Sequence, residues 1–130
     1  MTGKAKIFPA LKYDDAPKAL DWLKSAFGFA PHAVHKDDSG GIAHAEMKLG
    51  EAMIMFGSTR APEPANPWST EPMGVYVCVD DIDAHYARAQ AAGAEIVRPL
   101  ADTPYGAREY SARDCGGHLW SFGTYDPWKA

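Results

Sequence analysis

The chain has 130 residues, of which 46% are hydrophobic, 12% aromatic and 23% charged. These proportions are typical of one globular domain, and they exclude disordered, collagen-like and coiled-coil chains. The hydrophobic stretches are too short for a membrane-spanning helix, and residues 1–10 lack the hydrophobic run of a secretory signal. We therefore expect a cytoplasmic protein that makes no contact with a membrane.

Charge and cysteine content narrow the range of partners. The formal net charge is −4, with 13 lysines and arginines against 17 aspartates and glutamates. The basic residues are scattered, which argues against a nucleic-acid partner. Cys78 and Cys115 form no C-x-x-C motif, so we expect two small buried hydrophobic side chains and no disulfide.

The first elements in the chain are a predicted strand and a predicted helix. Residues 7–13 have strand composition, and Asp15 can then act as the N-cap of a helix with Pro17 in its first turn. Gly28 ends this helix. The hydrophobic residues of the helix recur every three or four positions and share one face: Ala16, Leu20, Leu23 and Phe27. That face must pack on a flat hydrophobic surface.

Three strands and a linker follow. Residues 32–37 and 52–57 have strand composition, and residues 42–49 alternate hydrophobic with polar side chains, as a strand with two different faces does. Residues 61–72 contain four prolines, which excludes a central strand or a helix interior and predicts a linker.

The same order of elements then recurs. The predicted elements are a strand at 74–79, a helix from 82 to near 93, strands at 94–100, 107–113 and 119–124, and a turn at 114–117. A shift of 66 residues aligns identical residues at caps, turns and strand ends, such as Asp15 with Asp81. The sequence therefore predicts an α+β fold of two βαβββ modules, at residues 1–60 and 73–130. An unrepeated α+β sandwich is the alternative.

Such a duplication encloses a cleft. Each module supplies a curved mixed sheet with one helix packed on its outside, and the two inner faces surround a concave site. Strand alternation places these candidate ligand-binding side chains on the inner faces: Phe8, His44, Glu46, Met53, Met55, Tyr76 and Ser121. Arg108 and Tyr110 are assigned to the inner face only by the 66-residue repeat, because hydrophobic and polar residues do not alternate in their strand. Trp68 of the linker and Tyr105 of a loop are candidates for the cleft mouth.

Several segments resemble a known family. They are residues 13–23 (YDDAPKALDWL), 77–83 (VCVDDID), 113–118 (RDCGGH) and 117–123 (GHLWSFG). Together they resemble the vicinal-oxygen-chelate superfamily of glyoxalases, bleomycin-resistance proteins and extradiol dioxygenases. The last segment is most similar to the PhnB-like and uncharacterised glyoxalase-like branch. The resemblance covers nearly the whole chain and implies the paired-module fold and a homodimer, but a fold does not carry an activity.

The resemblance also implies where a metal would bind. Metal enzymes of the superfamily hold a divalent ion with four inward His or Glu side chains. The corresponding positions here are Phe8, Met55, Gly74 and Ser121. None of these is a good metal ligand, so we expect neither a metal nor another cofactor. His44 and Glu46 share one strand face and are the best remaining polar pair. A metal contact, a place in a ligand pocket and a structural hydrogen bond stay open for this pair.

The sequence thus favours a metal-free protein that binds a small hydrophobic or aromatic compound in the cleft. If the compound is cationic, Glu46 is the residue expected to hold it. One alternative is a lyase or isomerase that uses an unrecognised metal site, or His44 as general base. Another is a non-catalytic scaffold or regulatory protein.

Overall fold

The computed structural model describes residues 5–115 and 117–129. The ends of the predicted modules at residues 1–4 and 130, and residue 116 of the predicted turn, lie outside the described residues. The first half holds β1 (Lys6–Tyr13), α1 (Ala16–Phe27), β2 (Ala30–Lys36), β3 (Ile42–Leu49) and β4 (Ala52–Ser58). A short 3-10 helix, η1 (Pro67–Ser69), follows. The second half holds β5 (Met73–Cys78), α2 (Ile82–Ala91), β6 (Glu95–Asp102), β7 (Arg108–Arg113) and β8 (Leu119–Gly123).

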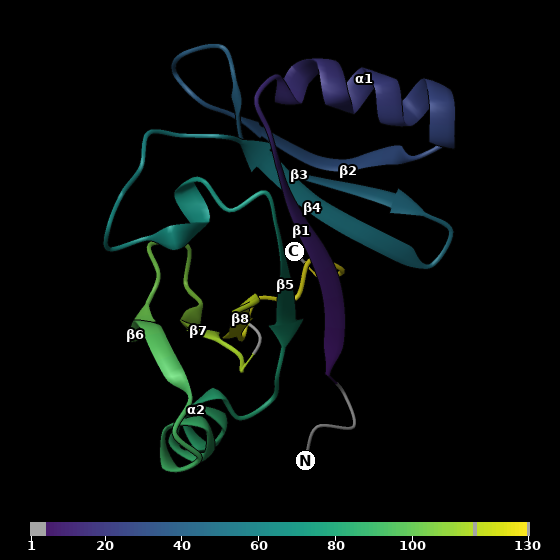
Figure 1. The fold of residues 1–130 in the computed structure, drawn as a ribbon. Helices are drawn as coiled ribbons and strands as arrows, with labels where there is room; N and C mark the ends of the chain where they lie inside the picture. The colour runs from purple at the N-terminus through teal and green to yellow at the C-terminus, as the bar shows by residue number, and fades with distance from the viewer. Residues whose placement is uncertain (1–4, 116, 130) are drawn as a thin grey trace.

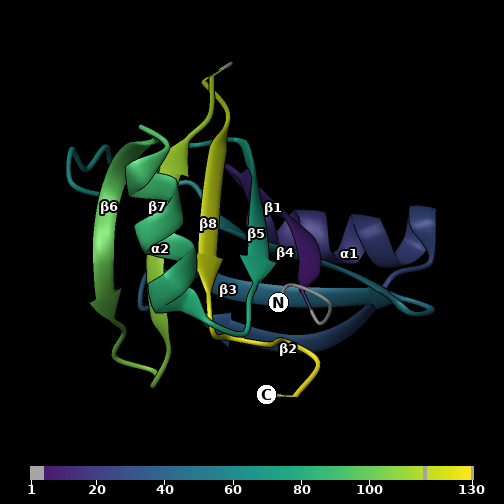
Figure 2. The ribbon, with the colours of Figure 1, turned by 90° about the horizontal axis from the view of Figure 1, so that it is seen from below.

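The described strands form one eight-stranded sheet in the order β2-β3-β4-β1-β5-β8-β7-β6 (Figure 1). β1 is parallel to β4, β5 is parallel to β8, and β1 pairs with β5 in antiparallel fashion. Each half therefore repeats one arrangement about the central β1–β5 pair, which confirms the predicted α+β fold of two βαβββ modules. In Figure 2 the strands β2 and β3 run across the direction of β5 and β8, so the sheet is strongly twisted between the modules.

Matching caps start the two helices. The Asp15 carboxylate accepts a hydrogen bond from the Lys18 backbone N–H at 3.1 Å, and Asp81 accepts one from Ala84 at the same distance. Gly28 ends α1 in the left-handed conformation, with φ at 77°. Each helix covers the outer side of its own module (Figure 1). This leaves the opposite faces of the modules free to build a site.

The hydrophobic core consists of three clusters. One lies under α1 around Leu23, Met47 and Phe56, and a second lies under α2 around Val77 and Tyr110. The third joins the modules and contains Phe8, Met53 and Tyr76. The predicted helical stripe is wrong at its end, because Phe27 is 58% exposed and packs edge-on against Trp22 at the surface.

The cysteine prediction is correct in part. No disulfide links Cys78 and Cys115, but Cys78 is only half-buried and Cys115 is exposed, so the expected burial is wrong. Cys115 belongs to the turn before β8, where a side chain has little to pack against. None of the described helices is long and hydrophobic enough to span a membrane.

Candidate functional site

The inner faces of the modules enclose a cleft of about 810 Å³. All eight strands of the described sheet contribute to its walls, together with the linker before β5 and Tyr125 after β8. Clefts of this size accommodate small molecules. The fold therefore forms the concave site that the duplication predicts.

Seven of the eleven side chains predicted for the cleft or its mouth line it: His44, Glu46, Met55, Trp68, Tyr76, Tyr105 and Ser121. Phe8 and Met53 do not line it, because both are buried beside Trp128 at the wall of a separate groove. Arg108 lies outside the cleft and forms ion pairs with Asp83 and Asp102. The prediction is wrong for these three side chains.

Tyr110 is the fourth residue that the structure places elsewhere. Its ring packs against Tyr86 of α2, and its hydroxyl is 2.6 Å from Nδ1 of His85. His85 of α2 is half-buried in this contact. Glu109 and Ser111 point to the inner side of β7 instead, and Glu109 lines the cleft.

The reason for this error lies in the register of the repeat. Met55 and Ser121 are 66 residues apart, but their neighbours across the strand pairs, Glu46 and Ser111, are 65 apart. The second module therefore has one more residue between these paired positions of β7 and β8 than the first has between those of β3 and β4. Residues Glu109 to Ala112 are all buried, so β7 shows no alternation that would reveal the slip.

A buried carboxylate, that of Glu46, lines the cleft. Glu46 is 1% exposed, and its Oε2 accepts hydrogen bonds from the Tyr125 hydroxyl and from Nε2 of His44, the latter at 2.8 Å. Oε1 makes no hydrogen bond within the described residues and lies 3.9 Å from Nε2 of His32. Burial alone would raise the pKa of Glu46, but the two hydrogen bonds and the two histidines outweigh burial and lower it.

A second carboxylate faces the cleft from the other module. Glu109 is buried, and its Oε2 accepts a hydrogen bond from the Tyr105 hydroxyl at 2.8 Å. Burial raises the pKa of Glu109 above its usual value, although Tyr105, Arg98 and His44 each act in the opposite direction. The pKa values of the two glutamates of the cleft are therefore shifted in opposite directions. The sequence gives no sign of Glu109, because its strand does not alternate.

The linker enters the cleft through Trp68. Its indole Nε1 donates a hydrogen bond to Oγ of Ser111 at 3.3 Å, and that hydroxyl donates to Oγ of Ser121 at 3.1 Å. The ring lies directly over Gly74, where an added β-carbon would be 2.3 Å from Cη2 of the ring. Trp68 thus covers part of the inner face of the second module, and only glycine at position 74 leaves it room.

The model of the Glyoxalase/Bleomycin resistance protein/Dioxygenase superfamily matches residues 9–122. The chain belongs to this superfamily. It is 30% identical to an uncharacterised protein of Mycobacterium bovis, with 88% of this chain and 80% of that protein covered. A superfamily member from Vibrio splendidus has the same fold, with a TM-score of 0.73 at 17% identity over 92% of this chain and 97% of the other. Methylmalonyl-CoA epimerase from Mycobacterium tuberculosis matches with a TM-score of 0.67 at 16% identity, over 89% and 84%.

The superfamily's metal site does not fit the residues of this chain. Of the four positions that the resemblance indicates, Phe8 lies outside the cleft and Gly74 lies beneath Trp68. Met55 and Ser121 do line the cleft, but a thioether and a hydroxyl are poor ligands for divalent ions. Within the described residues, no three His, Cys, Asp or Glu side chains gather in a way that could hold a metal ion.

Proposed function

We propose that this protein binds a small hydrophobic or aromatic molecule in the cleft between its modules, without coordinating a metal. The observation that carries the proposal is the character of the cleft at the superfamily's metal positions. There Met55, Ser121 and the Trp68 ring over Gly74 line or cover the walls where metal enzymes need His or Glu. A cavity with aromatic and thioether walls and a few fixed polar groups is typical of small-molecule sites.

A fragment screen tests this proposal. Aromatic fragments are screened against the purified protein by thermal shift and ligand-detected NMR, with Ala33→Phe as a variant that fills the cleft. Ala33 lines the cleft on β2, whereas Ala30 on the same strand is exposed outside it, so Ala30→Phe is the matched control. We expect hits that Ala33→Phe abolishes and Ala30→Phe retains. Hits that survive Ala33→Phe, or a complete lack of hits, would contradict the proposal, and the latter would favour a scaffold role.

A second candidate function is proton transfer by an isomerase. The observation that favours it is the His44–Glu46 pair. Because Nε2 of His44 donates to the carboxylate of Glu46, Nδ1 carries the lone pair and is the basic nitrogen. Glu109, with a raised pKa, faces the same cleft and can supply a proton. This arrangement allows His44 to act as general base without a metal.

Solvent-proton exchange tests the isomerase directly. Hydroxyketones are incubated with the protein in D2O, and exchange at the carbon next to the carbonyl is followed by proton NMR. If the isomerase proposal is correct, His44→Asn abolishes the exchange and His118→Asn, at an exposed position outside the cleft, retains it. Absence of exchange with the unmodified chain, or exchange that persists in His44→Asn, argues for binding alone.

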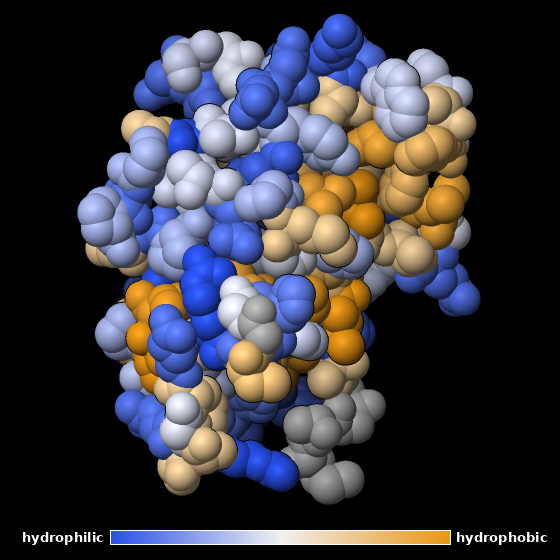
Figure 3. Space-filling model, viewed as in Figure 1, coloured by the Kyte–Doolittle hydropathy of each residue, from blue (hydrophilic) through white to orange (hydrophobic). Residues whose placement is uncertain are grey.

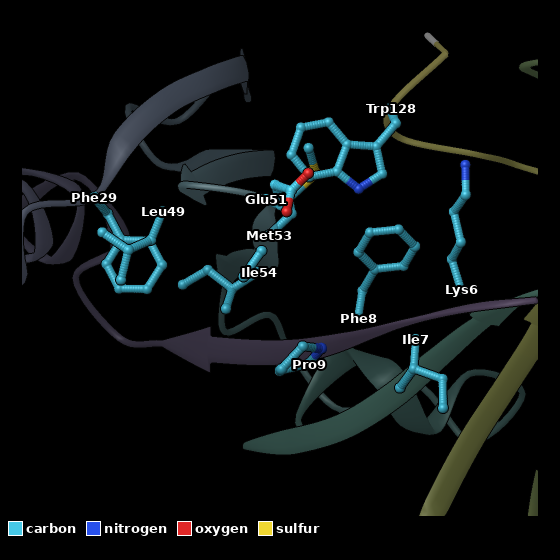
Figure 4. Close-up of a pocket in the computed structure, with 11 residues that line it drawn as sticks. Lys6, Ile7, Phe8, Pro9, Phe29, Leu49, Glu51, Met53, Ile54 and Trp128 are labelled. Carbon is cyan, nitrogen blue, oxygen red and sulfur yellow. The ribbon is translucent and has the colours of Figure 1, made fainter.

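We also propose that the protein associates with a second copy of itself. A hydrophobic groove of about 460 Å³ lies outside the cleft, and Figure 4 shows Leu49 and Phe29 at one end, Lys6 at the other, and Phe8 between them. Hydrophobic residues also gather over the part of the surface that holds α1 and the β3–β4 turn (Figure 3). The groove carries both a basic rim residue, Lys6, and an acidic one, Glu51. Lys6 is already paired with Asp126 at 2.7 Å, so the exposed hydrophobic residues of the groove, Ile7 and Leu49, carry this proposal.

A further inference from the structure

Two positively charged side chains that line the cleft, Lys12 and Arg60, lie close enough for their charges to interact. Lys12 on β1 pairs in register with Gly57 on β4. Beyond this pair, the backbone N–H of Thr59 donates to the carbonyl of Tyr13 at 3.0 Å, so the chain leaving β4 continues alongside the end of β1. This course brings Arg60 beside Lys12, and both side chains line the cleft.

Neither of these cations has an acidic partner within the described residues. The ion pairs among the described residues involve Lys6, Arg108, Arg113 and two histidines, but not Lys12 or Arg60. Lys12 is half-buried, and burial together with the neighbouring charge of Arg60 lowers its pKa. An unpaired, partly desolvated ammonium group beside a second cation raises the free energy of the empty cleft, and a bound anion would offset this cost.

The two carboxylates of the cleft differ from these cations, because each already accepts hydrogen bonds from neighbouring side chains. Glu46 accepts hydrogen bonds from His44 and Tyr125, and its remaining oxygen lies toward His32, which does not line the cleft. Glu109 accepts from Tyr105 and has Arg98 nearby. Arg98 also lines the cleft, but its charge acts on Glu109. Among the lysines and arginines of the cleft, Lys12 and Arg60 are therefore the two that act on no carboxylate of the cleft.

The space around Lys12 suits a ligand group. A β-carbon at Gly57 would lie 3.3 Å from Nζ of Lys12 and 2.8 Å from the carbonyl oxygen of Ala43, so glycine at this position keeps room beside the ammonium group. Met55 lies two residues before Gly57 on the same strand, and Trp68 also lines the cleft. An apolar body can rest on these two side chains while its charged end reaches the cations.

We propose that the ligand of the cleft is an apolar or aromatic compound with an anionic carboxylate or phosphate group, which Lys12 and Arg60 bind. The inference rests on the proposed binding function and specifies its ligand class. It replaces the expectation of a cationic ligand held by Glu46, because that carboxylate is already bonded to His44 and Tyr125.

Three probes with one ring system test the inference: 2-naphthoate, 2-naphthalenemethanol and 2-naphthylmethylammonium. Their affinities are measured by calorimetry, and the Trp68 indole N–H resonance, assigned from its loss in Trp68→Phe, reports binding inside the cleft. We expect 2-naphthoate to bind about tenfold or more tightly than the ammonium probe, because charge-assisted hydrogen bonds are made only to the anion. Lys12→Met and Arg60→Gln should each weaken naphthoate binding about tenfold, and Lys12→Glu should favour the ammonium probe.

Lys48→Met is the matched control, because Lys48 is exposed on β3 and does not line the cleft. It should leave the three affinities unchanged. If the three probes bind equally, or if Lys12→Met leaves naphthoate binding intact, the inferred ligand class is wrong while the binding function stands. If no probe shifts the Trp68 resonance, the inference fails together with the binding function. If 2-naphthoate does bind, a titration with sodium 2-naphthyl phosphate shows whether the cleft prefers a carboxylate or a phosphate group.

Discussion

Glu46 is a fully buried carboxylate that keeps its charge because other side chains supply hydrogen bonds. Desolvation disfavours the anion, but Tyr125 and His44 donate to the same oxygen and lower the pKa of Glu46 overall. Tyr125 belongs to the segment after β8, and its own carbonyl accepts a hydrogen bond from the Tyr76 hydroxyl at 2.7 Å. The end of the chain is thus attached to both modules through one side chain and its backbone.

Replacing Tyr125 with phenylalanine should therefore destabilise the fold. We expect Tyr125→Phe to lower the free energy of unfolding by about 1–2 kcal/mol at neutral pH, since a buried carboxylate loses a donor. Because the folded pKa of Glu46 is depressed, its contribution is present above the unfolded pKa and is lost as pH falls through the folded pKa. The difference between the two proteins should shrink in acid, as urea unfolding over a pH series would show.

Tyr13→Phe serves as the control for this experiment. The hydroxyl of Tyr13 makes no side-chain hydrogen bond within the described part of the chain, and its ring packs on Phe56 in either case. Its stability loss should be small and independent of pH. A Tyr125→Phe loss that stays constant into the acid range would mean that Tyr125 contributes by packing and not through Glu46.

At the scale of elements, sequence patterns predict what depends on local chemistry. The caps at Asp15 and Asp81 were predictable, because each is a hydrogen bond between the aspartate side chain and the backbone N–H three residues later. The position of Trp68 was not, since it depends on a glycine six residues later and on two serines from β7 and β8. The linker was thus predictable as a proline-rich segment, but its entry into the cleft required the tertiary structure.

The cap of α1 gives a direct stability prediction with a matched control. Asp15→Ala should lower the free energy of unfolding by about 1 kcal/mol, because the Lys18 N–H loses its acceptor at the start of the helix. Asp14→Ala changes an adjacent exposed carboxylate that caps nothing, and its effect should be near zero. Urea unfolding of both variants compares them. Equal losses would show that negative charge near the helix end matters and that the hydrogen bond does not.

The contact between the linker and β5 can be measured by a double-mutant cycle. Gly74→Ala should destabilise the protein by about 1–3 kcal/mol, because its β-carbon collides with the Trp68 ring and displaces it. In a Trp68→Ala background the same change should cost much less. Urea unfolding of the four chains gives the coupling, and we expect it to exceed about 0.5 kcal/mol. Additive losses would place the cost of the extra methyl group at the Leu119 carbonyl instead.

At the scale of the whole molecule, the duplication explains both the successes and the errors of the sequence prediction. The element order follows from hydrophobic periodicity repeated twice, and the sheet order confirms it. Alternation predicts the cleft residues of β3, β5 and β8, and Met55 of β4, but it wrongly places Phe8 of β1 and Met53 of β4 in the cleft. The inner residues of β7 cannot be found in this way, because the offset of the repeat is 65 residues at β7 and 66 at β8, and both faces of β7 are buried. When both faces of a strand are buried, the strands paired with it determine which face lines the cleft.

The groove outside the cleft gives the last prediction, which concerns assembly. Ile7 is 66% exposed and Leu49 47% exposed at its wall, an arrangement that costs free energy in a monomer. If a second copy covers the groove, sedimentation equilibrium should show a dimer, and Leu49→Lys should weaken it at least about tenfold by placing a charge in the interface. Met73→Lys is the control, because Met73 is 60% exposed but does not line the groove. A monomeric wild-type chain, or equal weakening by both lysines, would contradict the predicted interface.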